Sequence, residues 1–198
     1  MERRQFLIGA ALTMLEVVLR PNLVLQNLAE AAPAPLQLPQ ITETNLTFQF
    51  PLQSRIKTTM IIFHHIGGTN QDVSAAQVHQ WHLDKGWAGI GYHYVIRKNG
   101  RIERGRPLDA IGAHCYGYNP CSVGINLVGD FDTDIPTEAQ MASAKVLTAF
   151  LCNYYRLNPT VNKVIWGHRD LNSTECPGNN LYCKLGDIQK YSQQRIFS

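Results

Sequence analysis

Apolar and polar positions along the chain follow two different periods, and these periods predict a succession of strands and helices. A near-continuous apolar run at Thr58–Phe63 indicates a strand covered on both faces, with His64 and His65 at its exit. Ser74–Gln77 has the pattern of a capping box, which predicts a helix that runs to about Lys85. A buried strand followed by an amphipathic helix therefore opens the folded part of the chain.

The same signals continue through the second half of the sequence. Tyr92–Arg97 and Arg101–Arg106 flank Asn99-Gly100, a dipeptide that favours a tight turn between antiparallel strands. The remaining expected elements are a strand at Ser122–Val128, a helix that starts at Thr137, and a strand at Val161–Trp166. Strands interleaved with helices predict an α/β fold, in which a mixed central β-sheet is flanked by helices in a single domain.

Two further local patterns give expectations of their own. On the first helix, helical spacing predicts that Trp81 lies in the core, and that His79 and His82 lie at the surface without a metal-binding role. Residues 33–55 contain four prolines and scattered apolar positions, which is typical of a linker with one edge strand at Leu46–Phe50. The predicted catalytic domain then spans residues 56–198.

Residues 1–32 have the layout of an export signal. Arg3-Arg4 precedes Phe6-Leu7 and a moderately apolar run, and Ala29-Glu30-Ala31 has the small-x-small pattern of a cleavage site. This arrangement resembles a twin-arginine signal, so we expect a periplasmic or secreted protein with no stable membrane anchor after cleavage. An amphipathic terminal helix is the alternative, because Glu16 and Arg20 interrupt the apolar stretch.

Composition and charge narrow the class of partner. The 198 residues are 44% hydrophobic and 17% charged, which is ordinary for a globular domain with a sizeable core. The net charge of +3 is spread along the chain without runs of lysine and arginine. We therefore expect neither nucleic acid nor an anionic membrane as a partner. The sequence gives no indication of the oligomeric state.

The candidate chemistry is concentrated in one segment near the C-terminus. His168 directly follows the last predicted strand, and Cys176 comes eight residues later on a loop that must turn at Pro177-Gly178. These two side chains can converge if the loop folds back, with His64 as a third ligand of one metal ion. Taken singly, a histidine at a strand end is often satisfied by hydrogen bonds and a lone cysteine is often buried or in a disulfide. Spacing alone does not decide between these interpretations.

Five motifs in order then give the sequence a family resemblance. They are His64-His65 after a strand, Gly89-Ile90-Gly91-Tyr92-His93-Tyr94, Gly112-Ala113-His114, Ser122-Val123-Gly124-Ile125, and Gly167-His168-Arg169-Asp170 through Cys176-Pro177-Gly178. Together they resemble the N-acetylmuramoyl-L-alanine amidases related to phage amidase-type lysozymes and peptidoglycan recognition proteins. The resemblance covers roughly residues 56–190. It implies a zinc ion in a surface groove, bound by His64, His168 and Cys176.

The resemblance also implies an activity, the hydrolysis of the amide bond between N-acetylmuramic acid and L-alanine in peptidoglycan or muropeptides. Two neutral imidazoles and one thiolate leave a fourth tetrahedral position open on Zn²⁺, which is typical of catalytic sites. Tyr92 matches the catalytic tyrosine of the family. Thr174 stands where phage members carry a lysine and where the recognition proteins with amidase activity carry a threonine, so it can donate a hydrogen bond to the oxyanion or only cap its loop.

Three further residues match positions that the family places along its substrate groove or in its Glu-Gly-Arg segment. They are His93, His114 and Arg104, and we expect them to bind substrate. The alternative for each is an ordinary polar residue of a strand or loop. Since strand alternation sends His64 and His65 to opposite faces, a single zinc ion cannot use both.

The cysteine count is compatible with this assignment. If Cys176 binds zinc as the resemblance implies, an even set of four remains, and an exported protein can oxidise these thiols. We expect disulfides between Cys115 and Cys121, which bracket a short loop, and between Cys152 and Cys183. Four free thiols are the alternative.

Two other functions compete with the amidase. The first is a non-catalytic peptidoglycan-binding recognition module, a state that members reach by losing a zinc ligand. The second is a structural zinc domain, which needs a fourth protein ligand such as His65 or Cys183. The complete set of three predicted ligands favours the enzyme over both.

Overall fold

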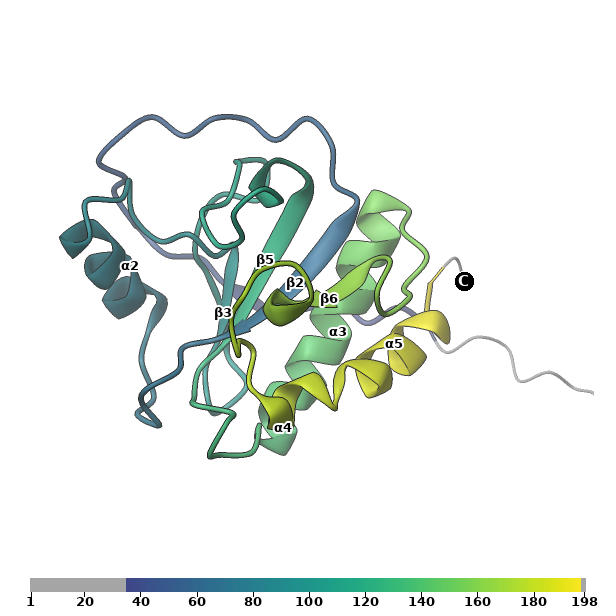
Figure 1. The fold of residues 1–198 in the computed structure, drawn as a ribbon. Coiled ribbons are helices and arrows are strands. Elements are labelled where there is room, and N and C mark those ends of the chain that lie inside the picture. The colour runs from purple at the N-terminus through teal and green to yellow at the C-terminus, as the bar shows by residue number, and fades with distance from the viewer. Residues whose placement is uncertain (1–34, 197–198) are drawn as a thin grey trace, which may run out of the picture. The chain divides into compact units, whose positions relative to one another are not determined.

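A mixed six-stranded sheet forms the centre of the computed structural model, which describes residues 35–196 (Figure 1). The strands are β1 (Ile41–Thr42), β2 (Met60–His65), β3 (Tyr94–Ile96), β4 (Ile102–Arg104), β5 (Ser122–Leu127) and β6 (Ile165–Gly167). They are ordered β1-β4-β3-β5-β2-β6, and β3 pairs antiparallel with β4 while the other four pairings are parallel. The export signal predicted for residues 1–32 lies outside the described residues.

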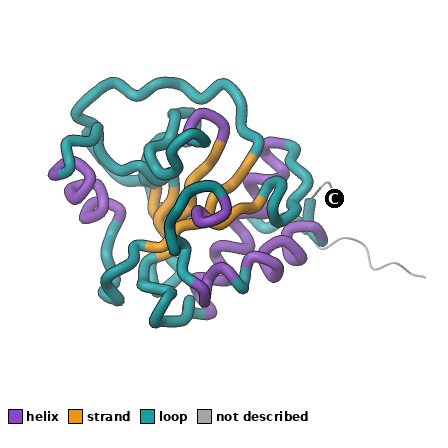
Figure 2. The backbone as a smooth tube through the Cα atoms, in the orientation of Figure 1, coloured by secondary structure: helices purple, strands orange, loops and turns teal. Residues whose placement is uncertain are grey.

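Helices cover both faces of this sheet. They are α2 (Ala75–Asp84), α3 (Glu138–Tyr155), α4 (Asn179–Tyr182) and α5 (Leu185–Gln193). Figure 2 shows α3 and α5 side by side on one side of the strands and α2 on the other. The expected α/β fold with a mixed sheet is therefore confirmed. Among the described residues, no helix combines the length and the apolarity needed to cross a membrane.

The main core lies between the sheet and helices α3 and α5. It is built from alternate residues of the central strands and from one stripe of each helix, including Ile61, Phe63, Ile125, Leu127, Leu147, Leu151 and Ile188. All of these side chains are fully buried, and burial of each stabilises the fold by about 1.5–3 kcal/mol. Because side chains alternate along a strand, Ile62 and His64 of β2 point to the opposite face. One face of the sheet thus supplies stability and leaves the other free to carry polar groups.

The helix starts and the hairpin follow the predictions. Ser74 caps α2 and Thr137 caps α3, and each forms the reciprocal capping box with a glutamine three residues later. The turn at Asn99-Gly100 joins β3 to β4, and Gly100 takes the positive φ of 84° that such a turn requires. The C-terminal helices α4 and α5 follow the last predicted strand and were not predicted.

The expected edge strand at Leu46–Phe50 is wrong. The outer edge of β4 is taken instead by Ile41–Thr42, which pairs with it in parallel as β1. Residues 46–50 leave the sheet and cover α2: the ring of Phe48 packs edge-on against His79, and the Gln49 N–H donates to the Ala88 carbonyl. Burial of the Phe48 ring against α2 therefore takes precedence over the strand propensity of this segment.

The expected orientation of α2 is also wrong. Its buried side is formed by Ala75, Val78, His79 and His82, whereas Trp81 is 40% exposed. The two histidines are buried because each accepts a backbone N–H from the segment before β3. His79 Nδ1 accepts from Ile90 N at 3.1 Å, and His82 Nδ1 accepts from Gly91 N at 3.0 Å. A neutral imidazole thus satisfies backbone donors that a tryptophan ring would leave unpaired.

Neither expected disulfide is formed, since all five cysteines are free. Cys115 Sγ instead lies 3.3 Å from the Asn172 amide oxygen, to which it donates. Cys152 is fully buried on α3, while Cys183 is exposed after α4. Cys121 Sγ, the expected partner of Cys115, donates to the Tyr118 carbonyl at 3.5 Å.

Candidate metal centre

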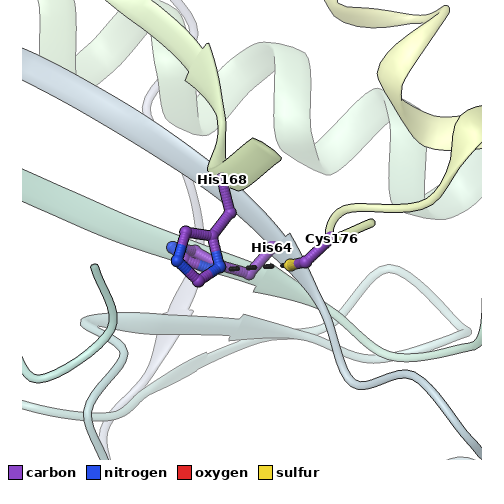
Figure 3. Close-up of side chains that lie close together, drawn as sticks. All are labelled: His64, His168 and Cys176. Atoms are coloured by element: carbon purple, nitrogen blue, oxygen red, sulfur yellow. Dashed lines mark hydrogen bonds between the residues drawn. The ribbon is translucent and has the colours of Figure 1, made fainter. Parts of the chain in front are cut away.

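Three side chains that the sequence singled out converge on one point (Figure 3). Nitrogen atoms of His64 and His168 and the sulfur of Cys176 all lie within 4.8 Å of one another. His64 Nδ1 is 3.6 Å from Cys176 Sγ, and the His64 and His168 ring centroids are 4.6 Å apart. His64 is buried, whereas His168 and Cys176 are half-buried. This separation of ligand atoms suits a single metal ion bound by nitrogen and sulfur.

Parallel pairing brings the two histidines together. The register of β2 with β6 pairs Phe63 with Gly167. The residues that follow these two, His64 and His168, therefore lie at the same edge of the sheet. His168 begins a short 3-10 helix, His168–Asp170, whose start is fixed by a 2.8 Å hydrogen bond from Gly167 N to Asp170 Oδ2. Two adjacent parallel strands thus deliver two imidazoles to one place.

Backbone hydrogen bonds bring the cysteine to the histidines. The Arg169 N–H donates to the Cys176 carbonyl at 2.7 Å, which folds the predicted loop back on itself. The Arg169 guanidinium also donates to the Glu175 carbonyl. On the side of β2, Cys176 Sγ lies 3.6 Å from His64 Nδ1, and the neighbouring backbone N–H of His65 lowers the pKa of the thiol. The thiol is therefore held beside β2 as well as beside the loop that carries His168.

Burial sets the protonation of the three groups. It lowers the pKa of His64 well below its usual value, and the nearby His168 lowers it further. Burial also lowers the pKa of His168, so both imidazoles are neutral at pH 7 and have a lone pair to offer. Burial raises the pKa of the Cys176 thiol to about 12, against the lowering effect of the His65 backbone N–H and Arg169. Ionisation of this thiol at neutral pH therefore requires a cation beside it, which fits a metal ligand.

His65, Asp130 and Asp132 form a second cluster of possible ligand atoms. Its hydrogen bonds argue against His65 as a metal ligand. His65 Nδ1 accepts from the Phe131 N–H at 3.1 Å, so in the neutral ring the proton is on Nε2 and no lone pair remains. Asp130 accepts from the backbone N–H of Gly68. This cluster holds a loop together, and the opposite orientations predicted for His64 and His65 are present.

Tyr92 and Thr174 both lie against the three-residue group. The Tyr92 ring centroid is 5.1 Å from that of His64, and burial together with the nearby Cys176 raises the pKa of its phenol. Tyr92 therefore keeps its proton at neutral pH and remains a hydrogen-bond donor. Thr174 Oγ1 accepts from the Cys176 N–H at 3.2 Å and so braces the loop that presents the thiol.

The three residues expected to bind substrate are placed differently from one another. His114 lies next to the centre, with its Nδ1 3.0 Å from His64 Nε2. His93 is fully buried beneath it and accepts the Gly124 N–H at Nδ1, so its side chain is not accessible to a substrate. Arg104 lies on β4, separated from β2 by two strands, and its guanidinium is paired with Glu43.

Two residues that the sequence analysis did not select as site residues contact His168 of the centre and the neighbouring His114. Asn172 Oδ1 lies 3.1 Å from His168 Nε2, and Ser122 Oγ lies 3.4 Å from His114 Nε2. Asn172 comes four residues after His168, and a turn in this segment brings the two side chains together. The sequence therefore contained a signal for the contact between Asn172 and His168. Ser122 gave no comparable signal, since its partner comes from a loop.

Comparison with known proteins agrees with this geometry. The sequence profile of the N-acetylmuramoyl-L-alanine amidase family matches residues 54–179, a range that contains all three converging side chains. The endolysin of Enterobacteria phage K11 is 37% identical over 135 residues, which cover 66% of this chain and 89% of the endolysin.

Solved structures of similar proteins share the fold. The endolysin and N-acetylmuramoyl-L-alanine amidase LysCS from Clostridium intestinale is 35% identical, with a TM-score of 0.71 over 78% of this chain and 98% of its own. A mutant of Drosophila PGRP-LB in complex with tracheal cytotoxin is 29% identical, with a TM-score of 0.62 over 76% of this chain and 88% of its own. The likeness thus includes both a named amidase and a named peptidoglycan recognition protein.

Proposed function

The chain belongs to the N-acetylmuramoyl-L-alanine amidase family, and we propose that it is a zinc-dependent enzyme that hydrolyses the bond between N-acetylmuramic acid and L-alanine. The observation that carries the proposal is the convergence of His64, His168 and Cys176 within 4.8 Å, next to Tyr92. The family, the K11 endolysin and LysCS support a peptidoglycan substrate. The predicted export signal supports action in the periplasm or outside the cell.

The donor set of the centre suits zinc. Two neutral imidazoles and a thiolate match its preference for nitrogen and sulfur, and the group has three members within residues 35–196. A zinc ion held by three protein ligands supplies Lewis acidity at an open position, which polarises a carbonyl group and makes water more acidic. His64 is buried whereas His168 and Cys176 are half-buried, so the substrate amide reaches the centre from the side of the latter two.

The chain's own side chains stabilise the charge that develops on the carbonyl oxygen. Tyr92 stays protonated, because burial and Cys176 raise the pKa of its phenol, and its ring lies beside that of His64, one of the proposed metal ligands. It therefore donates a hydrogen bond that strengthens as the oxygen becomes an oxyanion. Thr174 uses its oxygen to accept from the Cys176 N–H, and its hydroxyl hydrogen remains for the substrate.

Mass spectrometry of purified muropeptides tests the proposal. We expect the native protein to release stem peptides that begin with L-alanine, and we expect this release to stop after chelation and in Cys176→Ser. Cys183→Ser is the matched control, because Cys183 is an exposed free thiol outside the centre. Cleavage that survives both chelation and Cys176→Ser contradicts the role of zinc.

A non-catalytic recognition module is the second candidate, favoured by the likeness to the ectodomain complex of the peptidoglycan recognition proteins PGRP-LCa and PGRP-LCx, which was solved with tracheal cytotoxin bound. The same experiment separates the two functions. Intact muropeptide that remains bound to zinc-loaded protein identifies a recognition module, and free stem peptide identifies the amidase.

A further inference from the structure

Each candidate ligand imidazole is held by a hydrogen bond at one ring nitrogen. His64 Nε2 lies 3.0 Å from His114 Nδ1, and His168 Nε2 lies 3.1 Å from Asn172 Oδ1. We propose that His114 and Asn172 are positioning residues that fix both imidazoles as the Nε2–H tautomer and so leave Nδ1 of each ring for the cation. The inference rests on the proposed function, since it concerns how the same three residues hold their metal.

The direction of the hydrogen bonds on the His64 side follows from Ser122. Its hydroxyl donates to the Tyr118 carbonyl at 2.7 Å, and a hydroxyl has only one hydrogen to give. At 3.4 Å from His114 Nε2, the same oxygen must therefore accept from an Nε2–H group. His114 Nδ1 is then the unprotonated nitrogen, and it accepts from His64 Nε2–H. The lone pair on His64 Nδ1 consequently faces Cys176 Sγ, at 3.6 Å.

Asn172 plays the equivalent part for His168. Its Nδ2 donates to the carbonyl oxygens of Leu171 at 2.8 Å and Tyr116 at 3.3 Å, which settles which end of the amide is which. Its Oδ1 therefore faces His168 and accepts from Nε2–H. The Cys115 thiol donates to the same oxygen at 3.3 Å. The lone pair of the neutral His168 ring is thus on Nδ1.

A single segment, residues 114–122, contributes to both hydrogen-bond chains. It supplies His114 and Ser122 to one chain, and the Tyr116 carbonyl and Cys115 thiol to the other. Asn119 Oδ1 accepts from the His114 and Cys115 N–H groups at 2.8 and 2.9 Å, which stiffens the start of this segment. One loop therefore sets the orientation of both ligand rings.

Missing side chains make room for the His114 ring. A Cβ atom at Gly124 would lie 2.6 Å from His114 Cγ and Cδ2, and one at Gly112 would lie 2.4 Å from Cδ2. The ring lies directly on the sheet because these two positions are glycines. His114 is 8% exposed, so its ring is largely enclosed. A ring confined in this way orients His64 more effectively than it recognises a substrate, which refines the substrate-binding role predicted for it.

Nuclear magnetic resonance of the metal-free full chain tests the tautomers without any change to the site. Two-bond couplings in protein labelled with ¹⁵N at histidine distinguish Nδ1–H from Nε2–H rings, and single histidine variants assign the signals. We expect His64, His168 and His114 to be Nε2–H tautomers at pH 7.5. An Nδ1–H tautomer at His64 or His168 overturns the proposal, whether or not the protein is an amidase.

Zinc affinity, measured by competition with a chelating dye, tests the consequence. His114→Leu and Asn172→Leu remove the acceptor, and each is expected to weaken zinc binding about 10–100-fold. His114→Asn is the matched control, because the Asn side-chain oxygen can occupy the place of Nδ1, and it is expected to keep most of the affinity. Circular dichroism identifies variants that fail to fold.

A folded His114→Leu or Asn172→Leu protein with native zinc affinity contradicts the positioning role of that residue. Native protein that binds zinc without cleaving muropeptide overturns the proposed function instead. The tautomer measurement tests the inference without relying on zinc affinity or on muropeptide cleavage.

Discussion

The two faces of the central sheet bury different kinds of side chain. Toward α3 and α5, the central strands present the apolar residues Ile61, Phe63, Ile125 and Leu127. Toward α2, the same strands bury His64, Ser122 and Asn126 together with apolar neighbours such as Val95, and His93 is buried just before β3. The first face is a close-packed core, and the second face holds a set of imidazoles whose hydrogen bonds determine their chemistry. One sheet thus separates stability from function by the alternation of its strands.

His64 and His65 show the difference at the scale of one residue. They are adjacent in β2 and both are buried, at 1% and 8% exposure. His65 accepts a backbone N–H from Phe131 at Nδ1 and so holds a loop. Within residues 35–196, no backbone N–H donates to His64 Nδ1, which faces the Cys176 sulfur. The face on which each side chain lies, and not its residue type, separates a structural histidine from a candidate ligand.

The largest expected effect separates these two histidines. His64→Ala removes a ligand from the proposed centre, and we expect muropeptide hydrolysis to fall about 10³-fold or more, because a bound metal stabilises the transition state by several kcal/mol. His65→Ala leaves the Phe131 N–H without its acceptor, which costs about 1–3 kcal/mol of unfolding free energy. Muropeptide hydrolysis and zinc titrations measure the effect on the centre in both variants, and urea unfolding measures the effect on stability. Equal losses of zinc affinity in the two variants would remove the distinction.

A smaller effect is expected at Tyr92, on the same face. Tyr92→Phe removes one hydrogen-bond donor to the developing oxyanion and keeps the ring against His64. We expect kcat to fall about 10²–10³-fold with zinc affinity unchanged. Steady-state kinetics and zinc competition measure the two quantities separately. A variant that loses zinc together with activity would show that the phenol supports the centre rather than the reaction.

A change on the opposite face is expected to act on stability alone. Leu151 is fully buried in the core on α3, and Leu151→Ala leaves a cavity there. We expect the free energy of unfolding to fall by about 2–5 kcal/mol, with unchanged kcat for the fraction that remains folded. Urea unfolding followed by tryptophan fluorescence measures the first quantity. A lower kcat in fully folded variant protein would show that the two faces are coupled.

The smallest effect concerns pH. Burial lowers the pKa of His82 to about 4, with contributions from Lys85, Arg106 and His79, while the unfolded chain keeps the usual 6.5. Between these values the unfolded state binds a proton that the folded state does not, so stability falls as pH drops from 6.5 toward 4. His82→Asn retains an acceptor for the Gly91 N–H without this titration.

Urea midpoints measured from pH 7.5 to 4.5 test this prediction. The urea midpoint should fall less steeply with decreasing pH in His82→Asn than in the native protein. Other buried histidines, such as His64, His93 and His114, also have lowered pKa values. They contribute to the pH dependence of stability in both proteins. Parallel curves for the two proteins would exclude His82 as a contributor.

Local sequence patterns predicted those parts of the fold that depend on nearby residues. Capping boxes at Ser74 and Thr137 fixed two helix starts, because the hydrogen bonds involved span only three residues. The alternation of side chains along β2 likewise predicted that His64 and His65 lie on opposite faces of the sheet. The edge strand at Leu46–Phe50 failed because a distant helix, α2, offered more burial than the sheet edge.

The sequence by itself determined the order of the elements and the alternation that divides the sheet into two faces, and through the family resemblance it indicated the residue types of a zinc centre. Tertiary structure alone decided which ring nitrogen His64 and His168 each present, because that depends on partners far along the chain. His114 reaches His64 across 50 residues, and Cys115 reaches Asn172 across 57. No local period encodes such contacts, and the expected disulfides failed for the same reason. The parallel register of β2 and β6 and the loop of residues 114–122 set this chemistry.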